Sequence, residues 1–250
     1  MKKWILAVFL FLGLIGFKSY AYGFGPGISK NHARPSLGSK EQKIIEENNG
    51  VYIGPDRKEV YLTFDCGYEN GYTNQILDAL KETDTKAIFF ITGHYLNSAG
   101  DLVQRMMDEG HLIGNHTTSH RDFTQSTEAQ ILEDITSLEK KFTERFGKSM
   151  SKYVRPPRGE FSEQSQQLLA SNGYRSVFWS LAYVDWYQNT YNGNRYSYHT
   201  VMKRIHNGAV ILMHTVSKDN AVDLKDIIVD LKKEGYVFKS VDDLYQPVPY

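Results

Sequence analysis

The chain has 250 residues, 41% of them hydrophobic, and equal numbers of basic and acidic side chains give a formal net charge of zero. This length fits one large domain or at most two, with enough apolar residues for a buried core. Zero net charge argues against a nucleic-acid partner, because such partners are held largely by phosphate electrostatics. The 17 tyrosines would suit stacking against sugar rings, although surface tyrosines are common.

The first 21 residues are typical of a signal peptide. Lys2 and Lys3 precede an apolar run over residues 4–17, which is shorter than the roughly 20 residues of a membrane-spanning helix. Small residues at positions 19 and 21 predict cleavage after Ala21. The alternative is an uncleaved segment that associates the protein with a membrane. In both cases we expect the body of the protein to be exported and to work outside the cytoplasm.

Glycines and prolines are frequent in residues 22–57, where we expect an extended N-terminal arm with a short helix near residues 40–47. We expect the main domain to occupy residues 58–250. Cys66 is the single cysteine, so no disulfide can form within the chain.

From residue 58 onward, predicted strands and helices alternate. Thr127 and Gln130 form a capping-box pattern at the start of the longest predicted helix. The predicted strands cover residues 60–64, 87–92, 111–115, 153–154, 174–179, 209–213 and 236–239. The predicted helices cover residues 72–82, 101–109, 127–146, 162–171, 198–205 and 221–233.

This alternation predicts an α/β fold with parallel strands joined by helical crossovers. The number of units fits a distorted or incomplete (β/α) barrel better than an open doubly wound sheet. The dinucleotide-binding pattern G-x-G-x-x-G is absent after the first predicted strand of the domain.

Two predicted strands end in residues that carry chemistry. Asp65 and Cys66 end the first strand of the domain, and the carboxyl ends of parallel strands are where active sites lie. His116 and His120 follow the predicted strand 111–115, and histidines four apart on a helical turn can bind one metal ion. The alternative is a pair of surface histidines.

The sequence Arg155-Pro-Pro-Arg158-Gly predicts a rigid turn, since the prolines fix φ and the glycine permits a tight bend. Arginines held in this way can bind carboxylates with two donors. The alternative for Arg158 is a salt bridge to Glu160 or Glu163.

Two further residues suit acid–base chemistry. Asp185 precedes Trp186, which places a carboxylate beside an indole. His214 ends the apolar strand 209–213, where a histidine can transfer protons, although a lone histidine there is more often structural.

Taken together, these segments resemble the motif series of the polysaccharide deacetylase family, also called carbohydrate esterase family 4 or the NodB-homology domain. The resemblance covers about residues 58–244. The stretches TFDCGYENGYT, RPPRGEFS, FWS-x-A-x-VDW and LMHTVS look like the branch of delta-lactam-biosynthetic de-N-acetylases, which act on muramic acid of spore peptidoglycan.

The resemblance implies a role for each matching residue. Asp65 matches the base that activates water, Arg155 the arginine that orients it, and His214 the general acid, with Asp185 tuning it. His116 and His120 match metal ligands, for a divalent ion that is usually zinc and that polarises the carbonyl and the water. The N–H of Tyr68 would stabilise the oxyanion.

Cys66 departs from the family pattern, because it stands where the family usually has a second aspartate that binds the metal. A thiolate is a good zinc ligand, so Cys66 can preserve the site in altered form. The alternatives are a weak two-histidine site or a buried inert thiol.

The expected activity is removal of the N-acetyl group from N-acetylmuramic acid in peptidoglycan glycan strands. Arg158 would bind the lactyl carboxylate of that sugar, and Trp186 and Tyr68 would contact the substrate. The alternatives are a deacetylase for N-acetylglucosamine or chitin-type polymers and a non-catalytic glycan-binding protein.

Overall fold

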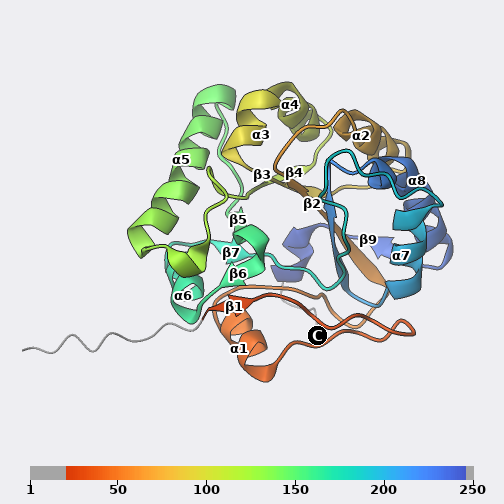
Figure 1. The fold of residues 1–250 in the computed structure, drawn as a ribbon, viewed down its shortest axis with the longest axis horizontal. Helices are drawn as coiled ribbons and strands as arrows, with labels where there is room; N and C mark the ends of the chain where they lie inside the picture. The colour runs from red at the N-terminus through yellow and green to blue at the C-terminus, as the bar shows by residue number, and fades with distance from the viewer. Residues whose placement is uncertain (1–20, 246–250) are drawn as a thin grey trace, which may run out of the picture.

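A curved sheet of parallel strands forms the centre of the protein (Figure 1). The computed structural model describes residues 21–245, and seven strands of this part of the chain join in the sheet. The hydrogen-bonded order is β7-β5-β4-β3-β2-β8, and β9 pairs with the start of β2. These strands are β2 (Glu59–Cys66), β3 (Ile88–Ile91), β4 (Leu112–Asn115), β5 (Tyr153–Val154), β7 (Arg175–Ser176), β8 (Ala209–His214) and β9 (Val237–Phe238).

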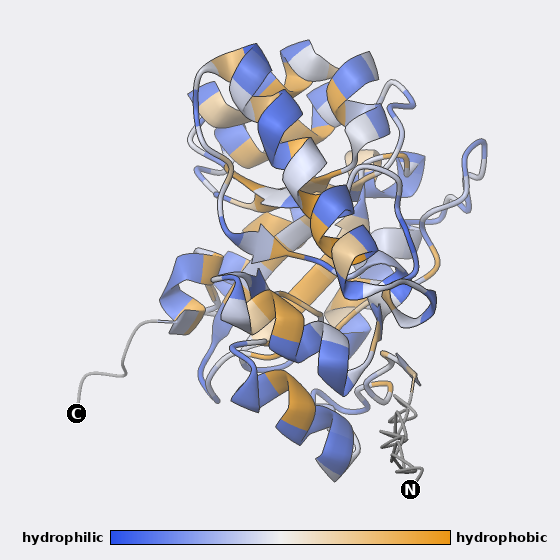
Figure 2. Cartoon of the chain, turned by 90° about the vertical axis from the view of Figure 1, so that its left-hand side faces the viewer, coloured by the Kyte–Doolittle hydropathy of each residue, from blue (hydrophilic) through white to orange (hydrophobic). Residues whose placement is uncertain are grey.

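Helices connect the strands and cover one face of the sheet, as parallel pairing requires. In Figure 1 α2, α3 and α4 lie along the top, α5 on the left, and α7 and α8 on the right. Their polar residues face outward, in blue, and their apolar residues face the sheet (Figure 2). The α-helices are α1 (Ser39–Glu47), α2 (Thr73–Glu82), α3 (Gly93–Ser98), α4 (Gly100–Asp108), α5 (Glu128–Phe146), α6 (Glu163–Ser171), α7 (Tyr196–Arg204) and α8 (Lys218–Lys233). Short 3-10 segments are η1 (Phe123–Gln125), η2 (Pro157–Gly159) and η3 (Val241–Tyr245).

The two faces of β2 have different environments because successive side chains of a strand point in opposite directions. The even-numbered residues from Val60 to Cys66 belong to the large apolar cluster between the sheet and the helices. On the opposite face, Tyr61 belongs to a smaller apolar cluster inside the curve of the sheet. Thr63 and Asp65 share that inner face. The strand therefore places Asp65 inside the curve and Cys66 outside it.

The incomplete barrel predicted from the sequence is confirmed. The segment after β5 first pairs with β5 as β7 and then crosses the open side of the curve. Leu181 forms a parallel bridge to Ile211 of β8, and Ser180 N–H donates to Val210 O at 2.9 Å. The strand predicted over residues 174–179 is therefore confined to β7, because the chain leaves one edge strand to reach the other.

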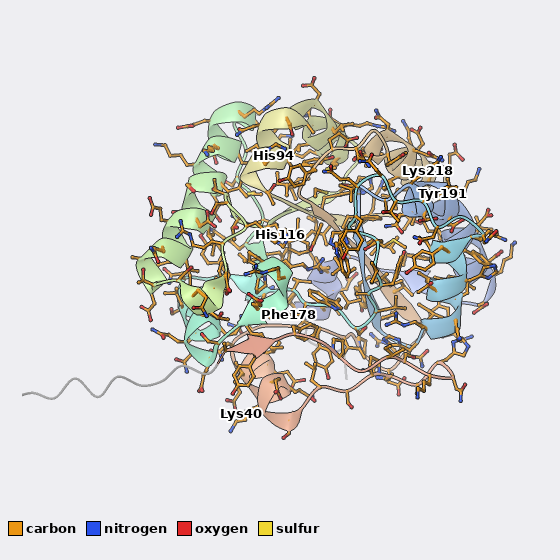
Figure 3. The ribbon with its side chains drawn as sticks, viewed as in Figure 1. Lys40, His94, His116, Phe178, Tyr191 and Lys218 are labelled. Atoms are coloured by element: carbon orange, nitrogen blue, oxygen red, sulfur yellow. The ribbon has the colours of Figure 1, made fainter. Side chains whose placement is uncertain are left out.

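The segment 22–57, predicted as an extended arm leading into the domain, contributes buried side chains to the core. The strand β1 (Tyr22–Gly23) pairs antiparallel with β6 (Glu160–Phe161). Phe24 is buried, and its ring lies 4.6 Å from that of Phe178 and 5.0 Å from that of Trp179. Figure 3 labels Phe178 just above this segment.

Most predicted elements are present with boundaries shifted by a few residues. The capping box of Thr127 and Gln130 is confirmed, and Gly147 ends α5 in the left-handed conformation. The sequence pattern does not predict the short helix α3, which lacks a clear apolar period. The predicted signal peptide lies almost entirely outside the described residues, and within residues 21–245 no helix is long and apolar enough to cross a membrane.

If the N-terminal segment is part of the core, Phe24→Ala should lower the free energy of unfolding by about 3–5 kcal/mol, the usual cost of removing a buried aromatic ring. Denaturant unfolding measures this change. Ile28→Ala is the matched control, because Ile28 lies on the same segment and is 69% exposed. Equal stability of the two variants would show that the segment does not contribute to the core.

Candidate active site

The candidate site lies where the carboxyl ends of β2, β4, β5 and β8 meet. Asp65 of β2 is paired in register with His214 of β8. Elsewhere in the sheet, Asn115 at the end of β4 is paired with Val154 of β5. His116 and Arg155, which directly follow these two strands, therefore lie side by side. The parallel register therefore brings together four of the residues predicted from the sequence.

Arg155 and Asp65 form a buried ion pair. The Nη1 atom of Arg155 donates to Oδ1 of Asp65 at 2.8 Å. The rest of the guanidinium is also bound: Nη2 donates to Thr63 Oγ1 and Phe178 O, and Nε donates to Val177 O. Arg155 is fully buried, so its planar group holds one oxygen of Asp65 in a fixed orientation. The predicted orienting contact of Arg155 with Asp65 is present in the structure.

His116 lies on the other side of Asp65. Its Nδ1 atom donates to the carbonyl of Arg155 at 2.9 Å, which leaves Nε2 as the acceptor nitrogen. Nε2 lies 3.5 Å from Oδ2 of Asp65. Nε2 of His116 and Oδ2 of Asp65 each carry a lone pair, and the distance between them is longer than a hydrogen bond. A cation or a proton donor that contacts both atoms would fit this arrangement. Figure 3 shows His116 near the middle of the molecule.

His116 and His120 are brought together by an irregular loop, so the predicted helical turn is wrong. Thr117 and His120 have φ values of 66° and 57°, in the left-handed region. The loop is held from outside, because Asn115 Oδ1 accepts from Thr117 N and Asp134 accepts from Ser119 N. The two imidazole rings still lie 4.8 Å apart between their centroids.

His214 forms a second charged pair with Asp185. The Nδ1 atom of His214 donates to Asp185 Oδ1 at 2.7 Å, and the backbone N–H of His214 donates to Oδ2 at 2.8 Å. The ring of Trp186 lies 5.8 Å from that of His214 and at 66° to it. The predicted pairing of Asp185 with His214 is present in the structure.

The environment shifts the pKa values in opposite directions. Burial alone raises the pKa of Asp65, but Arg155, His116 and His214 outweigh it and the net pKa is lowered. Burial alone lowers the pKa of His214, but the carboxylates of Asp185 and Asp65 reverse this and the net pKa is raised. The lowered pKa keeps Asp65 ionised, and the raised pKa favours the protonated form of His214.

The two other histidines remain neutral. Burial lowers the pKa of His116, and burial together with repulsion from a second proton on the neighbouring His116 lowers the pKa of His120 to about 4. A neutral imidazole keeps a lone pair, which a metal ligand requires. These two side chains are thus suited to binding a metal ion.

Cys66 does not reach this pair, which corrects its prediction as a third ligand. Its side chain is fully buried in the apolar cluster between the sheet and the helices, on the face of β2 opposite to Asp65. Burial raises the pKa of the thiol, which opposes the thiolate form that binds metals. In this structure Cys66 corresponds to the alternative of a buried inert thiol.

The donors present do not complete a metal site with three protein ligands. Within residues 21–245, no group of three or more His, Cys, Asp or Glu side chains is arranged to hold a metal ion. The donor set is two neutral imidazoles beside Asp65, whereas catalytic zinc usually has three protein ligands. We therefore assign no reaction step to a metal.

The predicted substrate residues lie at the exposed rim. Tyr68 is 54% and Trp186 47% exposed, and the ring of Tyr68 lies 4.6 Å from that of His94. Arg158, in the left-handed conformation, forms ion pairs with Glu160 at 2.9 Å and with Asp122 at 3.0 Å. The salt bridge to Glu160, the alternative interpretation of Arg158, is thus present, and the side chain remains about half exposed.

Two residues of the site were not identified from the sequence. Thr63 supports Arg155, and the alternation of β2 provides a signal for it, because Thr63 is a polar residue on the face of Asp65. Asn220 donates to Asp185 Oδ2 from the first turn of α8. No spacing rule identifies Asn220, since the contact depends on how α8 packs.

If Cys66 is a buried thiol and not a ligand, Cys66→Ala should keep the metal content of the purified protein, measured by elemental analysis. The thiol of the native protein should resist alkylation with and without chelator, because burial alone protects it. Loss of metal in Cys66→Ala, or chelator-dependent alkylation of a protein that stays folded, would restore the thiol as a ligand.

Comparison with known proteins identifies the family of the chain. The family model of polysaccharide deacetylase matches residues 53–177. The chain is 46% identical over 217 residues to PdaA of Bacillus subtilis, a peptidoglycan-N-acetylmuramic acid deacetylase. The aligned residues cover 86% of this chain and 82% of that protein. It is 33% identical to a peptidoglycan-N-acetylglucosamine deacetylase of Bacillus cereus, over 81% and 74% of the two chains.

The fold agrees as well. The solved structure of Bacillus subtilis PdaA, described as a family 4 carbohydrate esterase, superimposes with a TM-score of 0.86 at 45% identity and covers 90% of this chain and 96% of that one. The chain is a member of the polysaccharide deacetylase family.

Proposed function

We propose that the protein hydrolyses the N-acetyl group of N-acetylmuramic acid residues in peptidoglycan glycan strands. The observation that carries this proposal is the pairing of Asp65 with His214 across β2 and β8, each held by its own charged partner. Such a base and acid side by side suit amide hydrolysis. The choice of sugar is supported by the 46% identity to the Bacillus subtilis relative named for that activity.

Asp65 is proposed as the general base. Arg155 holds its Oδ1 atom, so Oδ2 is the oxygen left to accept a proton from water. The lowered pKa keeps Asp65 ionised and ready to act. The water then attacks the carbonyl carbon of the acetamide.

His214 is proposed as the general acid. Its Nδ1 atom is engaged by Asp185, so Nε2 is the nitrogen that can donate to the departing amine. The raised pKa favours the protonated ring, which is the form that a general acid requires. Donation breaks the C–N bond and releases acetate and a free amine. We propose that the backbone N–H of Tyr68 stabilises the oxyanion formed between these steps.

Family members are generally dependent on a metal ion. For this chain we propose a weakly held divalent ion, zinc, on Nε2 of His116 and on His120, because both are neutral imidazoles. When bound, it would supply a positive charge next to the carbonyl and the water.

Two proposals concern the setting. We propose that the product amine serves the formation of muramic delta-lactam in spore cortex, as the motif resemblance implies. We also propose that the protein is exported, with transient membrane association through its first residues.

The Bacillus cereus relative favours a second candidate substrate, N-acetylglucosamine in peptidoglycan. Acetate release from strands with and without lactyl groups separates the two substrates.

Asp65→Asn and His214→Ala should each lower kcat by about 10²- to 10⁴-fold, the usual contribution of a positioned acid or base. Acetate release from purified glycan measures kcat, and circular dichroism checks the fold. Arg57→Gln is the control, because Arg57 lies just before β2, at the opposite end of the strand from Asp65, and forms an ion pair with Glu59 at 3.1 Å. Near-normal release by either site variant would contradict the assigned role.

Arg158→Tyr should lower activity on stem-free muramic acid strands and leave activity on glucosamine strands unchanged. One charge-assisted hydrogen bond from Arg158 to the lactyl carboxylate contributes about 1.5–3 kcal/mol, although in the free protein this side chain is paired with Glu160 and Asp122. The ratio of kcat/KM for the two sugars is the measurement. An unchanged ratio would show that Arg158 serves only its salt bridges.

A further inference from the structure

Asn220 is a buried side chain that touches Asp185, and the catalytic roles above do not use it. It lies in the first turn of α8, where Ser217 caps the helix, and it is fully buried. Its Nδ2 atom donates to Asp185 Oδ2 at 2.6 Å and to the backbone carbonyl of His214 at 3.0 Å. One amide group thus binds both members of the Asp185–His214 pair.

The direction of this amide is fixed from its other end. The Oδ1 atom of Asn220 accepts from the hydroxyl of Tyr183 at 2.7 Å and from the hydroxyl of Ser197 at 2.7 Å. Because both groups can donate, exchange of the amide oxygen and nitrogen would leave two hydroxyls facing N–H groups and an oxygen facing a carboxylate. The NH₂ group therefore points to Asp185.

The amide of Asn220 is an uncharged donor, and its lack of charge affects the pKa of His214. Burial lowers the pKa of His214, but the charge and hydrogen bond of Asp185 and the charge of Asp65 together raise it, so a lysine or arginine at position 220 would cancel part of the effect of Asp185. A neutral amide holds the carboxylate without offsetting its charge. Asp185 Oδ2 then receives two donors, from His214 N and from Asn220, and Oδ1 faces Nδ1 of His214.

We propose that Asn220 is a positioning residue of the reaction: it fixes the carboxylate of Asp185 against His214, and Tyr183 and Ser197 fix the direction of its amide. The proposal rests on the assigned role of His214 as general acid. Asn220 connects α7, through Ser197, and α8 to the loop that carries Asp185. The packing of α7 against α8 thereby affects the orientation of His214, the proposed proton donor.

The first experiment replaces the amide. Asn220→Ala should lower kcat about 10- to 100-fold, the usual cost of losing a group that orients a reacting side chain, with KM within about twofold of the wild type. Asn207→Ala is the matched control, because the Nδ2 atom of Asn207 makes one hydrogen bond, to Asp56 away from the site, and its kcat should not change. A folded Asn220→Ala variant with wild-type kcat would overturn the proposal.

The second experiment separates positioning from stability. In the double variant, Asp185→Asn combined with Asn220→Asp, the amide and the carboxylate exchange places. The new carboxylate at position 220 can accept from both hydroxyls, but one of its oxygens faces the backbone carbonyl of His214, to which Asn220 donates in the wild type. Circular dichroism therefore has to show that the double variant is folded before its pKa is measured. The negative charge no longer contacts His214, so its pKa should fall and the basic limb of the pH–rate profile should move to lower pH.

The pKa of His214 can be measured by NMR titration of its ring without any substrate. The other charged groups that act on His214, Asp65 and Arg155, are unchanged in the double variant. Tyr183 and Tyr196 are the titratable groups that sense Asp185, and burial keeps the pKa of both raised. In the single variant Asn220→Ala the same titration should also give a lowered His214 pKa, because the carboxylate of Asp185 is no longer held against the ring. An unchanged His214 pKa in folded Asn220→Ala would overturn the proposal. A lowered pKa together with no deacetylation by the wild type would reject the proposed substrate and leave the positioning role standing.

Discussion

The buried ion pair of Arg155 with Asp65 is the interaction on which the rest of the site depends. A guanidinium without exposed surface is costly to bury, and here carbonyls, a hydroxyl and a carboxylate satisfy its donors, while its carbon lies 4.3 Å from the ring centre of Phe90. Removing one partner of such a pair typically costs about 3–5 kcal/mol. The same contacts hold β2, β5 and the segment after β7 at fixed distances, so the base is positioned by the architecture of the barrel.

The two carboxylates of the site, Asp65 and Asp185, have different charged partners and therefore different roles. Asp65 faces a permanent cation and has a lowered pKa, whereas Asp185 faces a histidine and raises the pKa of that ring. One carboxylate is thereby kept ready to accept a proton, and the other keeps a proton on its neighbour. Because β2 and β8 are adjacent and in register, the two pairs lie side by side without any loop rearrangement.

The alternation of strands and helices was predictable from the sequence, because apolar periodicity records which face of each element is buried. Three residues of the two charged pairs, Asp65, Arg155 and His214, were also predictable because each lies at or just after a strand end. Asp185 lies in the loop after β7, and only the resemblance to the family motifs indicated it. The loop of His116 and His120 was not predictable, because two left-handed residues are held there by Asn115 and Asp134. Cys66 shows a related limit: strand alternation assigns it to the face opposite Asp65, but the last residue of a strand can turn either way.

The pairing of β1 with β6 also bears on the order of folding. Phe24 N–H donates to Gly159 O at 3.1 Å, so the beginning of the described chain is joined to the turn that carries Arg158. During synthesis the N-terminal segment emerges long before that turn, and contacts distant in sequence form slowly. Until residues 161–179 are available, the apolar side chains of Phe24 and of Ile45 on α1 lack part of the cluster that covers them in the native state, namely Phe161, Phe178 and Trp179. A nascent chain of this protein therefore passes through a stage with exposed apolar surface, in which binding by a chaperone would compete with aggregation.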